Sequence, residues 1–190
     1  LRPEGTAQVV RAYIERNLHS WPQPVKTYYI GPMFRYERPQ KGRYRQFHQF
    51  GAEALGSGSP LLDVELIAIP IEIYRTLGLD KFTVHVNSIG CPTCRPQYRE
   101  RLRAHLQKGF DRLCPSCQER IERNPLRVLD CKNEGCRAVA AGHPVTYEHL
   151  CDECEAHFTE VKSGLDGLGL EYVVDGRLVR GLDYYTRTVF

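Results

Sequence analysis

Apolar and polar residues alternate along residues 26–37 and 43–55, and this period of two predicts two β-strands. The sequence PQKG between them predicts a turn, so the two strands form a hairpin. Apolar residues spaced three and four apart predict a helix over residues 7–17, with Thr6 as its N-cap, and a second helix over residues 61–77, across Pro70. The remaining predicted elements are strands at 81–87, 170–176 and 178–190 and helices at 97–107, 115–123 and 151–162.

This order of elements predicts an α+β fold, with an antiparallel sheet, flanking helices and a mainly helical, cysteine-rich insertion. Residues 88–175 hold all eight cysteines and carry 12 Lys/Arg against 14 Asp/Glu, whereas the rest of the chain carries 14 against 9. We therefore predict a partial domain over residues 1–87, an insertion over 88–175 and a return to the first domain over 176–190. The excess of positive charge outside the insertion favours anion binding there.

The bulk composition excludes two classes of protein. With 42% hydrophobic residues the chain can build a core, so it is not a disordered chain. No run of eighteen apolar residues occurs and the opening LRPEGTAQ has no apolar signal region, so we expect a cytoplasmic protein with no membrane partner. Because the chain opens without Met and ends inside a predicted strand, we expect it to be a piece of a longer protein.

The hairpin carries five Arg or Lys and two carboxylates between Phe34 and Glu53. Residues of equal parity share one face of a strand. One face of the hairpin thus presents Arg35, Glu37, Arg43, Arg45, Phe47, Gln49 and Glu53, and the other face of the second strand presents Tyr44, Gln46, His48, Phe50 and Ala52, which suit packing. The first face fits a ligand with an anionic end, because guanidinium groups match phosphate oxygens and an aromatic ring stacks on a base. A solvated, arginine-rich strand edge is the alternative.

The cysteines form four closely spaced pairs: Cys91/Cys94, Cys114/Cys117, Cys131/Cys136 and Cys151/Cys154. Two such pairs can complete a tetrahedral Cys₄ site, so we predict one or two structural zinc ions. We expect neighbouring pairs along the chain to join, the first with the second and the third with the fourth, although interleaved pairing is also open. His143 and His149 are candidate replacement ligands, while disulfides, redox pairs or incidental cysteines are the alternatives.

Three stretches resemble the histidyl-tRNA synthetase family of class II aminoacyl-tRNA synthetases. FRYERPQKGRYRQFHQ (residues 34–49) is similar to class II motif 2, LRPEGTA (1–7) to the family's amino-acid-binding turn, and LVRGLDYYTRTVF (178–190) to its histidine signature. The middle of the chain agrees more loosely, through RNPLRVLDCKN. The resemblance implies a class II synthetase-like antiparallel sheet and a homodimer.

The resemblance also assigns roles at the nucleotide. Arg35 is implied to bind the ATP α-phosphate, and Glu37 to lie near the adenine or ribose. Arg43 is implied to reach the terminal phosphates or the tRNA end, and Phe47 to stack on adenine. Mg²⁺ bridging the phosphates is expected, without identifiable ligands.

For the amino acid, the resemblance implies that Glu4, Gly5, Thr6 and Gln49 surround the α-amino group and that Glu53 with Tyr184 or Tyr185 binds the imidazole. Arg180 is implied to be the catalytic arginine, with Arg35, that neutralises charge as the histidine carboxylate attacks the α-phosphorus. The implied reaction activates L-histidine with ATP and then transfers it to tRNA(His).

Two other functions stay open on the sequence. One is a non-catalytic, histidine-sensing regulatory subunit of ATP phosphoribosyltransferase, which shares the fold but tends to lose the residues equivalent to Arg35, Phe47 and Arg180. The other is an RNA-binding zinc module, disfavoured because carboxylates such as Glu53 repel phosphates. No counterpart of motif 1, motif 3 or an anticodon-binding domain is visible, so the 190 residues alone are not expected to aminoacylate.

Overall fold

The computed structural model describes residues 1–180 and 184–190, which divide into two compact units, Leu1–Leu66 and Ile67–Phe190. Residues 181–183, inside the last predicted strand, lie outside the described part.

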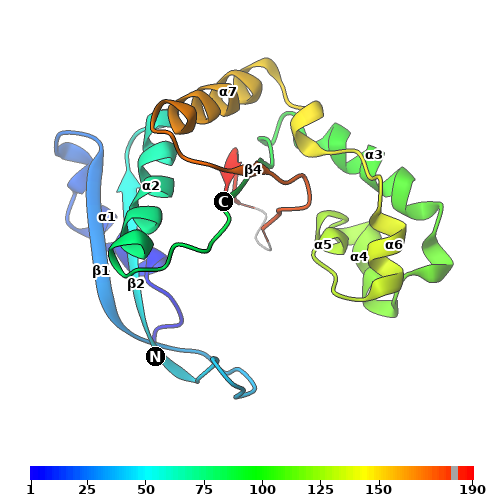
Figure 1. Ribbon diagram of the computed structural model, residues 1–190, viewed down its shortest axis with the longest axis horizontal. Helices are drawn as coiled ribbons and strands as arrows, with labels where there is room; N and C mark the ends of the chain where they lie inside the picture. Colours follow the sequence, from blue (N-terminus) through cyan, green and yellow to red (C-terminus); the bar gives the residue numbers. More distant parts are fainter. Residues whose placement is uncertain (181–183) are drawn as a thin grey trace. The chain divides into compact units, whose positions relative to one another are not determined.

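The first unit is built on an antiparallel hairpin. Strands β1 (Val25–Phe34) and β2 (Gln46–Leu55) pair from Val25 opposite Leu55 to Phe34 opposite Gln46 (Figure 1). Before them lie helix α1 (Thr6–Glu15) and the 3₁₀ turn η1 (Leu18–Ser20), and after them begins helix α2 (Pro60–Thr76). The predicted hairpin and both predicted helices are confirmed. The strands end earlier than expected, because residues 35–45 leave the regular ladder; they keep an isolated bridge between Gln40 and Arg43 and a backbone hydrogen bond from Arg35 N–H to the Arg45 carbonyl at 2.9 Å.

Helix α2 runs through Pro70, as predicted. A proline inside a helix removes one backbone hydrogen bond. Val64, Ile67 and Ile71 are buried and spaced three and four apart, so they form one apolar stripe along the helix. Burial of this stripe offsets the bond lost at Pro70.

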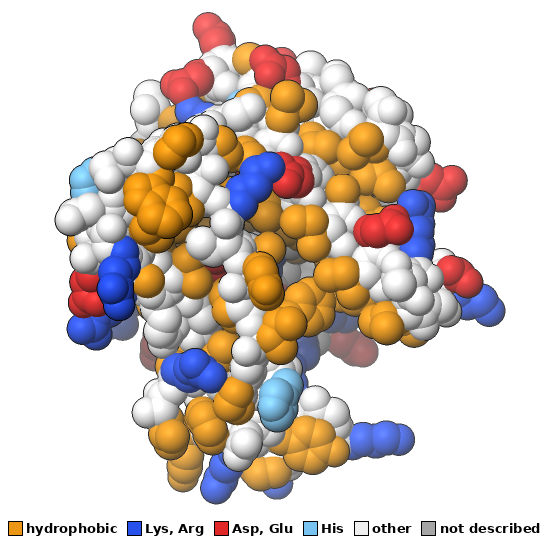
Figure 2. All heavy atoms as spheres, turned by 90° about the vertical axis from the view of Figure 1, so that its left-hand side faces the viewer, with side chains coloured by type: hydrophobic (Ala, Val, Ile, Leu, Met, Phe, Trp, Pro, Cys, Tyr) orange, Lys and Arg blue, Asp and Glu red, His pale blue; other side chains and the backbone are white. Residues whose placement is uncertain are grey.

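The prediction of which hairpin face packs is wrong. Tyr28 and Ile30 on β1 are 81% and 74% exposed, and their neighbour Phe50 on β2 is 50% exposed. Figure 2, which views the molecule from the side of α1 and β1, shows hydrophobic side chains at the surface among Lys and Arg side chains. The odd-numbered face is the more buried one, because the N-terminal turn packs on it: Arg35 Nε donates to the carbonyl of Pro3.

The second unit combines a small sheet with a helical cluster. Its strands are β3 (His85–Ser88), β4 (Val173–Val174) and β5 (Thr188–Val189), in the order β4-β3-β5. The helical segments are α3 (Arg95–Gln107), η2 (Phe110–Arg112), α4 (Pro115–Arg123), α5 (Leu126–Leu129), α6 (Glu134–Ala140), η3 (Thr146–Glu148) and α7 (Asp152–Gly167). Figure 1 shows α4, α5 and α6 gathered beside α3.

The sheet of this unit contains the predicted antiparallel pairing and one parallel pair besides it. β3 pairs antiparallel with β5 but parallel with β4. A parallel pair needs a long crossover connection, and the helical segments between β3 and β4 supply it. The predicted strands at 81–87, 170–176 and 178–190 keep only two to four strand residues each within the described residues. The α+β class is confirmed.

The helical cluster has its own core. Tyr98, Leu102 and Leu106 of α3 are fully buried at intervals of four residues, and Cys117, Ile121 and Cys136 from α4 and α6 pack with them. This spacing lines one face of a helix, which is why α3 forms despite its many charged residues.

Candidate functional site

Three residues predicted for amino-acid binding meet at the start of α1. The Glu4 carboxylate accepts from the backbone N–H of Thr6 at 2.5 Å and of Ala7 at 3.0 Å. Thr6 Oγ1 donates to Glu53 Oε1 of β2 at 2.6 Å. Thr6 is therefore the first residue of the helix and not its N-cap, a correction: Gly5 holds the N-cap position, and because it has no side chain the Glu4 carboxylate satisfies the first N–H groups. The geometry joins the N-terminal turn to β2.

Gln49 lies on the same face of β2 as Glu53, four residues nearer the turn. Its Nε2 donates to the Tyr29 hydroxyl at 3.3 Å, while its buried Oε1 has no hydrogen-bond partner among the described residues. A buried acceptor without a donor is costly, and a ligand donor would satisfy it. The sequence reasoning missed Tyr29, although Tyr29 has the same parity as Arg35 on the first strand, which is the signal that could have placed it on this face.

Gly51 is needed under the Tyr29 ring. A Cβ atom built on Gly51 would lie 2.3 Å from Tyr29 Cζ, closer than carbon atoms approach. The glycine thus lets the ring lie against the strand, where its hydroxyl meets Gln49. Gly5, also predicted for this site, is buried in the N-terminal turn.

The cationic residues follow at the turn end of the hairpin. The Arg35 guanidinium lies over the Phe47 ring, 4.9 Å from its centroid, so the two predicted nucleotide residues share one face as parity required. Arg43 Nη1 lies 3.7 Å from Glu37 Oε2, which brings the other two predicted nucleotide residues together. Arg35, Glu37 and Arg43 lie beyond the strand ends, but the backbone hydrogen bond from Arg35 N–H to the Arg45 carbonyl carries the pairing as far as Arg35.

The predicted residues of the C-terminal segment lie in the second unit. Arg180 is exposed, and its Nη2 donates to the carbonyl of Phe190. The rings of Tyr184 and Tyr185 are exposed and stack with centroids 4.9 Å apart. These three residues belong to the second unit, whereas Glu4, Thr6, Gln49 and Glu53 belong to the first.

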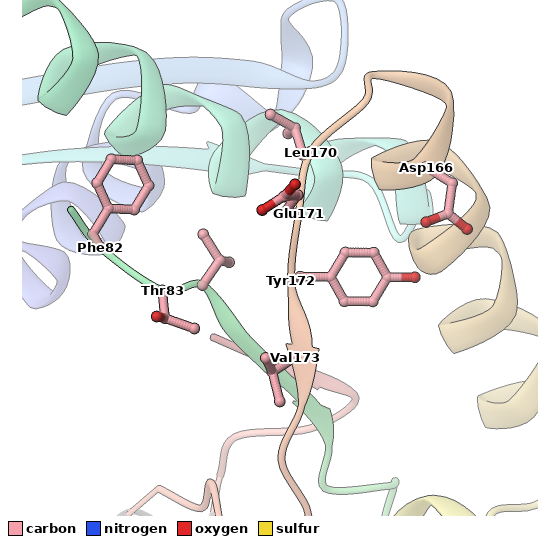
Figure 3. Close-up of a pocket in the computed structure, with 8 residues that line it drawn as sticks. Phe82, Thr83, Asp166, Leu170, Glu171, Tyr172 and Val173 are labelled. Carbon is pink, nitrogen blue, oxygen red and sulfur yellow. The ribbon is translucent and has the colours of Figure 1, made fainter. Parts of the chain in front are cut away.

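A hollow of about 680 Å³ in the second unit contains none of the predicted site residues. Its walls come from the segment before β3, the end of α7 and β4 (Figure 3): Phe82, Thr83, Val84, Asp166, Leu170, Glu171, Tyr172 and Val173. Burial raises the pKa of Tyr172, and its hydrogen bond to the Asp166 carboxylate raises it further. None of the described residues that line the hollow is cationic, and two are acidic, so this lining does not suit a phosphate.

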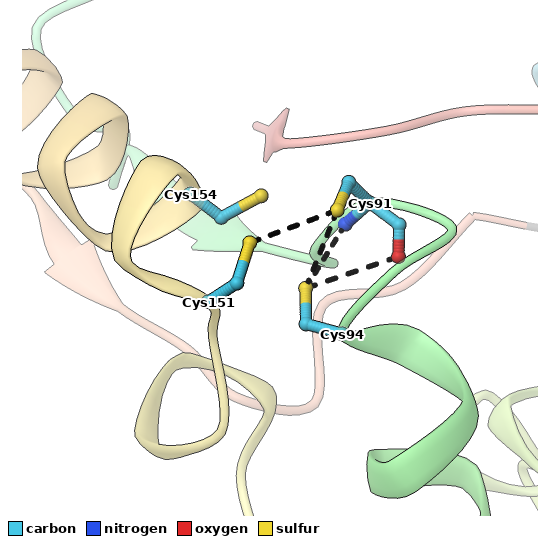
Figure 4. A group of neighbouring side chains, drawn as sticks. All are labelled: Cys91, Cys94, Cys151 and Cys154. Atoms are coloured by element: carbon cyan, nitrogen blue, oxygen red, sulfur yellow. Dashed lines mark hydrogen bonds between the residues drawn. The ribbon is translucent and has the colours of Figure 1, made fainter.

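The eight cysteines form two groups of four, and the predicted pairing is wrong. Cys91, Cys94, Cys151 and Cys154 make the outer cluster (Figure 4), and Cys114, Cys117, Cys131 and Cys136 make the inner cluster. The first pair along the chain thus joins the fourth, and the second joins the third. This nesting follows from the topology, because the chain leaves the sheet at Cys91 and α7 returns it from Cys151.

The sulfur positions fit a tetrahedral ion. Cys91 Sγ lies 3.7 Å from Cys94 Sγ and 3.8 Å from Cys151 Sγ, and in each cluster all four sulfurs lie within 4.8 Å of one another. Four sulfurs about 2.3 Å from a tetrahedral zinc ion lie about 3.8 Å apart. Disulfide bonds, in which sulfurs are about 2.0 Å apart, are absent, and all eight cysteines are free.

Each cluster contains thiols with opposite pKa shifts. Backbone hydrogen bonding from Cys94 lowers the pKa of Cys91 to about 6, and that from Cys117 lowers the pKa of Cys114 to about 7. Burial raises the pKa values of Cys117, Cys136 and Cys154. A thiolate beside buried thiols is the donor set that a bound cation would deprotonate fully.

Neither candidate histidine joins a cluster. His143 Nδ1 lies 2.9 Å from the carbonyl oxygen of Ala140, and the His149 ring lies 6.2 Å from that of Tyr98. Both clusters therefore have four sulfur donors.

In the described residues no helix is long and apolar enough to span a membrane.

Solved structures place this fold among synthetase-like proteins. The chain is 42% identical to the apo histidyl-tRNA synthetase of S. aureus, with a TM-score of 0.75 over 99% of this chain and 44% of that one. A Bacillus halodurans structure, described as an ATP phosphoribosyltransferase regulatory subunit/histidyl-tRNA synthetase, is 22% identical with a TM-score of 0.64 over 99% of this chain and 52% of that one. The second likeness shows the fold alone.

Sequence comparison then identifies the family. A family model described as Histidyl-tRNA synthetase matches residues 1–190, and the chain belongs to this family. Proteins named histidine--tRNA ligase from Desulforamulus reducens and Desulfitobacterium hafniense are 57% and 56% identical over 190 residues. Each match covers 100% of this chain and 45% of the relative, so the chain spans less than half the length of these relatives.

Proposed function

We propose that the protein, at the full length of its curated relatives, activates L-histidine with ATP and transfers the histidyl group to tRNA(His). The contact that carries the proposal is the meeting of Glu4, Thr6 and Glu53 beside Gln49, whose buried Oε1 accepts no hydrogen bond from a described residue. The carboxylates of Glu4 and Glu53 and the amide oxygen of Gln49 are three acceptors near one another. They fit a ligand that is rich in N–H donors, as histidine is with its ammonium and imidazole groups.

In the first step the histidine carboxylate attacks the α-phosphorus of ATP, forming histidyl-adenylate and releasing pyrophosphate. Arg35 would hold the α-phosphate, and Arg180 would balance the negative charge that develops there. In the second step a ribose hydroxyl at the tRNA end attacks the activated carbonyl, and AMP leaves. Arg35 and Arg180 would act in the first step by position and charge and would not transfer protons.

At the nucleotide, Phe47 would stack on the adenine ring. Its contact with Arg35 supports this role, since a base bound on Phe47 would carry its phosphates toward the guanidinium. Glu37 and Arg43, paired at the turn, would hold the ribose side and the terminal phosphates. Mg²⁺ would neutralise and bridge these phosphates.

At the amino acid, Glu4, Gly5, Thr6 and Gln49 would surround the ammonium group. Glu53 and a hydroxyl from Tyr184 or Tyr185 would bind the two imidazole nitrogens. A pocket that hydrogen-bonds both nitrogens would reject analogues that lack them, because its buried polar groups would be left unpaired.

The two cysteine clusters would each hold one structural zinc ion. Four sulfur ligands leave no open position for chemistry, so the metal would fix the fold. The proposal keeps residues 88–175 as an insertion between two parts of a catalytic domain. It also includes a homodimer. A cytoplasmic location is part of the proposal as well, because eight unpaired cysteines suit a reducing compartment.

The regulatory-subunit alternative is less well supported. The relatives at 57% and 56% identity are named as ligases, whereas the structure described as a regulatory subunit is 22% identical. The deciding experiment is histidine-dependent exchange of pyrophosphate into ATP. It is made on the full-length protein, meaning a protein of the length of the relatives that contains these 190 residues. Exchange that requires histidine, and that Arg35→Ala abolishes, supports the ligase; histidine binding without exchange supports the regulatory subunit.

A further inference from the structure

The backbone of the histidine-signature segment is held by residues that adjoin the outer cysteine cluster. Ile89 N–H donates to the carbonyl of Arg187 at 2.8 Å, and Arg187 N–H donates to the carbonyl of Gly90 at 2.9 Å. These bonds extend the β3–β5 pairing up to Cys91. The segment that carries Tyr184 and Tyr185 therefore ends against the first cysteine turn.

Arg95, which follows Cys94, makes the second link. Its side chain is buried, with Nε donating to the carbonyl of Ile89 at 3.2 Å and Nη2 to that of Gly90 at 3.1 Å. Nη2 also donates to the carbonyl of Tyr185. One buried guanidinium thus joins the cysteine turn to the tyrosine pair.

Gly90 fixes the close approach of these parts. Its φ is +68°, and a Cβ atom built there would lie 2.7 Å from Cys94 Sγ. Only glycine combines this left-handed backbone with a sulfur so near. The Gly90 carbonyl accepts from both Arg95 and Arg187, so any displacement of the cysteine turn is passed directly to the signature segment.

The second cysteine pair of the outer cluster reaches the same segment. Arg187 Nη2 donates to Glu153, which lies between Cys151 and Cys154. Arg187 has a φ of 61°, a left-handed backbone that a residue with a side chain keeps only when its surroundings hold it. Both halves of the outer cluster thus hold Arg187, one through its backbone and one through its side chain.

The inner cluster is placed differently. Its hydrogen bonds stay within the helical part, as in the bond from Cys114 N–H to Cys136 Sγ at 3.2 Å. The helical core meets the C-terminal segment through packing of Val179. Among the described residues, the backbone groups of Tyr185 and Arg187 form hydrogen bonds with Arg95, Ile89 and Gly90, which adjoin the outer cluster.

We propose that a metal ion in the outer cluster positions the histidine-signature segment, so that histidine affinity depends on the outer metal and not on the inner one. The inference rests on the proposed histidine binding. The ion ties the Cys91 turn to the start of α7, and this holds the Gly90 carbonyl and the Arg95 guanidinium where they anchor Tyr185 and Arg187. Arg95 is a positioning residue, since it acts on the tyrosines through their backbone.

The test compares two matched variants of the full-length protein, Cys151→Ser and Cys131→Ser. Both remove a half-buried ligand, one from each cluster. Each variant is expected to lose one zinc by metal analysis. Cys151→Ser should weaken histidine binding, measured by calorimetry, by about tenfold or more and should speed hydrogen exchange at the Arg187 amide. Cys131→Ser should leave both as in the unmodified protein, and neither should change ATP affinity.

Equal histidine affinity and equal exchange at Arg187 in the two variants would overturn the proposal. If Cys151→Ser does not fold, stepwise chelation of the unmodified protein gives the same comparison. Hydrogen exchange in the Cys91 turn then reports the loss of the outer zinc, and exchange at the Arg187 amide must rise together with it. Protection at Arg187 that survives removal of both ions overturns the proposal. A protein that binds no histidine at all refutes the proposed function instead, while the exchange result still decides the positioning role.

Discussion

The buried amide of Gln49 lets binding be separated from stability at a single residue. Gln49→Leu removes an acceptor that no described residue satisfies, together with the long hydrogen bond from Nε2 to the Tyr29 hydroxyl, so the free energy of unfolding without ligand should fall by about 1 kcal/mol at most. Histidine affinity should fall about 10- to 100-fold, because the ligand would lose a buried partner. Calorimetry and urea unfolding of the full-length protein measure the two effects.

The control is Gln46→Leu, the same change on the exposed face of the same strand. It should leave histidine affinity unaltered. An equal loss of affinity in both variants would show that the odd face of β2 is not the amino-acid site.

Gly51 offers a test of the close approach to Tyr29. Gly51→Ala places a Cβ atom 2.3 Å from the ring, so the ring or the strand must move, and the free energy of unfolding should fall by about 1–3 kcal/mol. Gly167→Ala in α7, where nothing lies within 4 Å of the added Cβ, should be neutral or slightly stabilising. A Gly51→Ala protein as stable as the Gly167→Ala protein would contradict the packing described.

At the scale of elements, the periodicity of the sequence correctly predicted the features that depend on contacts between residues close together in the chain. The hairpin, α1 and α2 follow from alternation and helical spacing, and the shared face of Arg35 and Phe47 follows from parity. The exposed face around Tyr28 could not be predicted, because alternation shows that two faces differ but not which one is covered. Cysteine spacing likewise predicted paired ligands but not their nesting, which depends on where the long insertion returns to the sheet.

The inner cluster should act as a folding centre for the helical cluster. Cys117→Ser is expected to reduce the zinc content from two ions to one per chain and to lower the free energy of unfolding by about 3 kcal/mol or more, because a structural ion binds only the folded form. Metal analysis and thermal unfolding measure both effects. Ser116→Ala, at the exposed neighbouring position, serves as the control. Unchanged zinc content in Cys117→Ser would contradict the assignment.

Asp175, just after β4, links pH to the stability of the small sheet. Burial alone would raise its pKa, but hydrogen bonds from Arg177, the charge of Arg177 and a bond with His85 together hold the pKa of this carboxyl below its usual range. A depressed pKa means that the ionised form stabilises the fold above about pH 4, and that this contribution is lost as the pH falls through the folded-state pKa.

Asp175→Asn should therefore reduce the free energy of unfolding by about 1 kcal/mol at pH 7, and the gap from the unmodified protein should narrow below pH 4. Urea unfolding of both proteins at pH 7, 5 and 3.5 measures the gap. Comparison at equal pH cancels any effect of acid on the cysteine clusters. A gap that is constant over this range would show that Asp175 is not the linked group.

At the scale of the whole molecule, the two units carry different parts of the proposed chemistry. The first unit holds Arg35 and the residues proposed to accept hydrogen bonds from histidine, and the second holds Arg180 and the tyrosine pair. The first unit also exposes Tyr28, Ile30 and Phe50 on one sheet face. An open face of this kind needs a cover in a stable protein, and the curated relatives have more than half of their length outside the matched region.

This difference in length leads to a prediction for the 190-residue chain by itself. It should retain both zinc ions, since each cluster takes all four ligands from the second unit, but it should form no histidyl-tRNA. The full-length protein should form histidyl-tRNA. The additional residues would cover the exposed face of the hairpin and would add ATP-binding groups to those of the 190 residues. Aminoacylation of tRNA(His) and metal analysis, made on both proteins in parallel, separate the two statements. Histidyl-tRNA formed by the chain alone would show that its two units already assemble a complete site, and zinc lost from the chain alone would show that the clusters depend on residues beyond it.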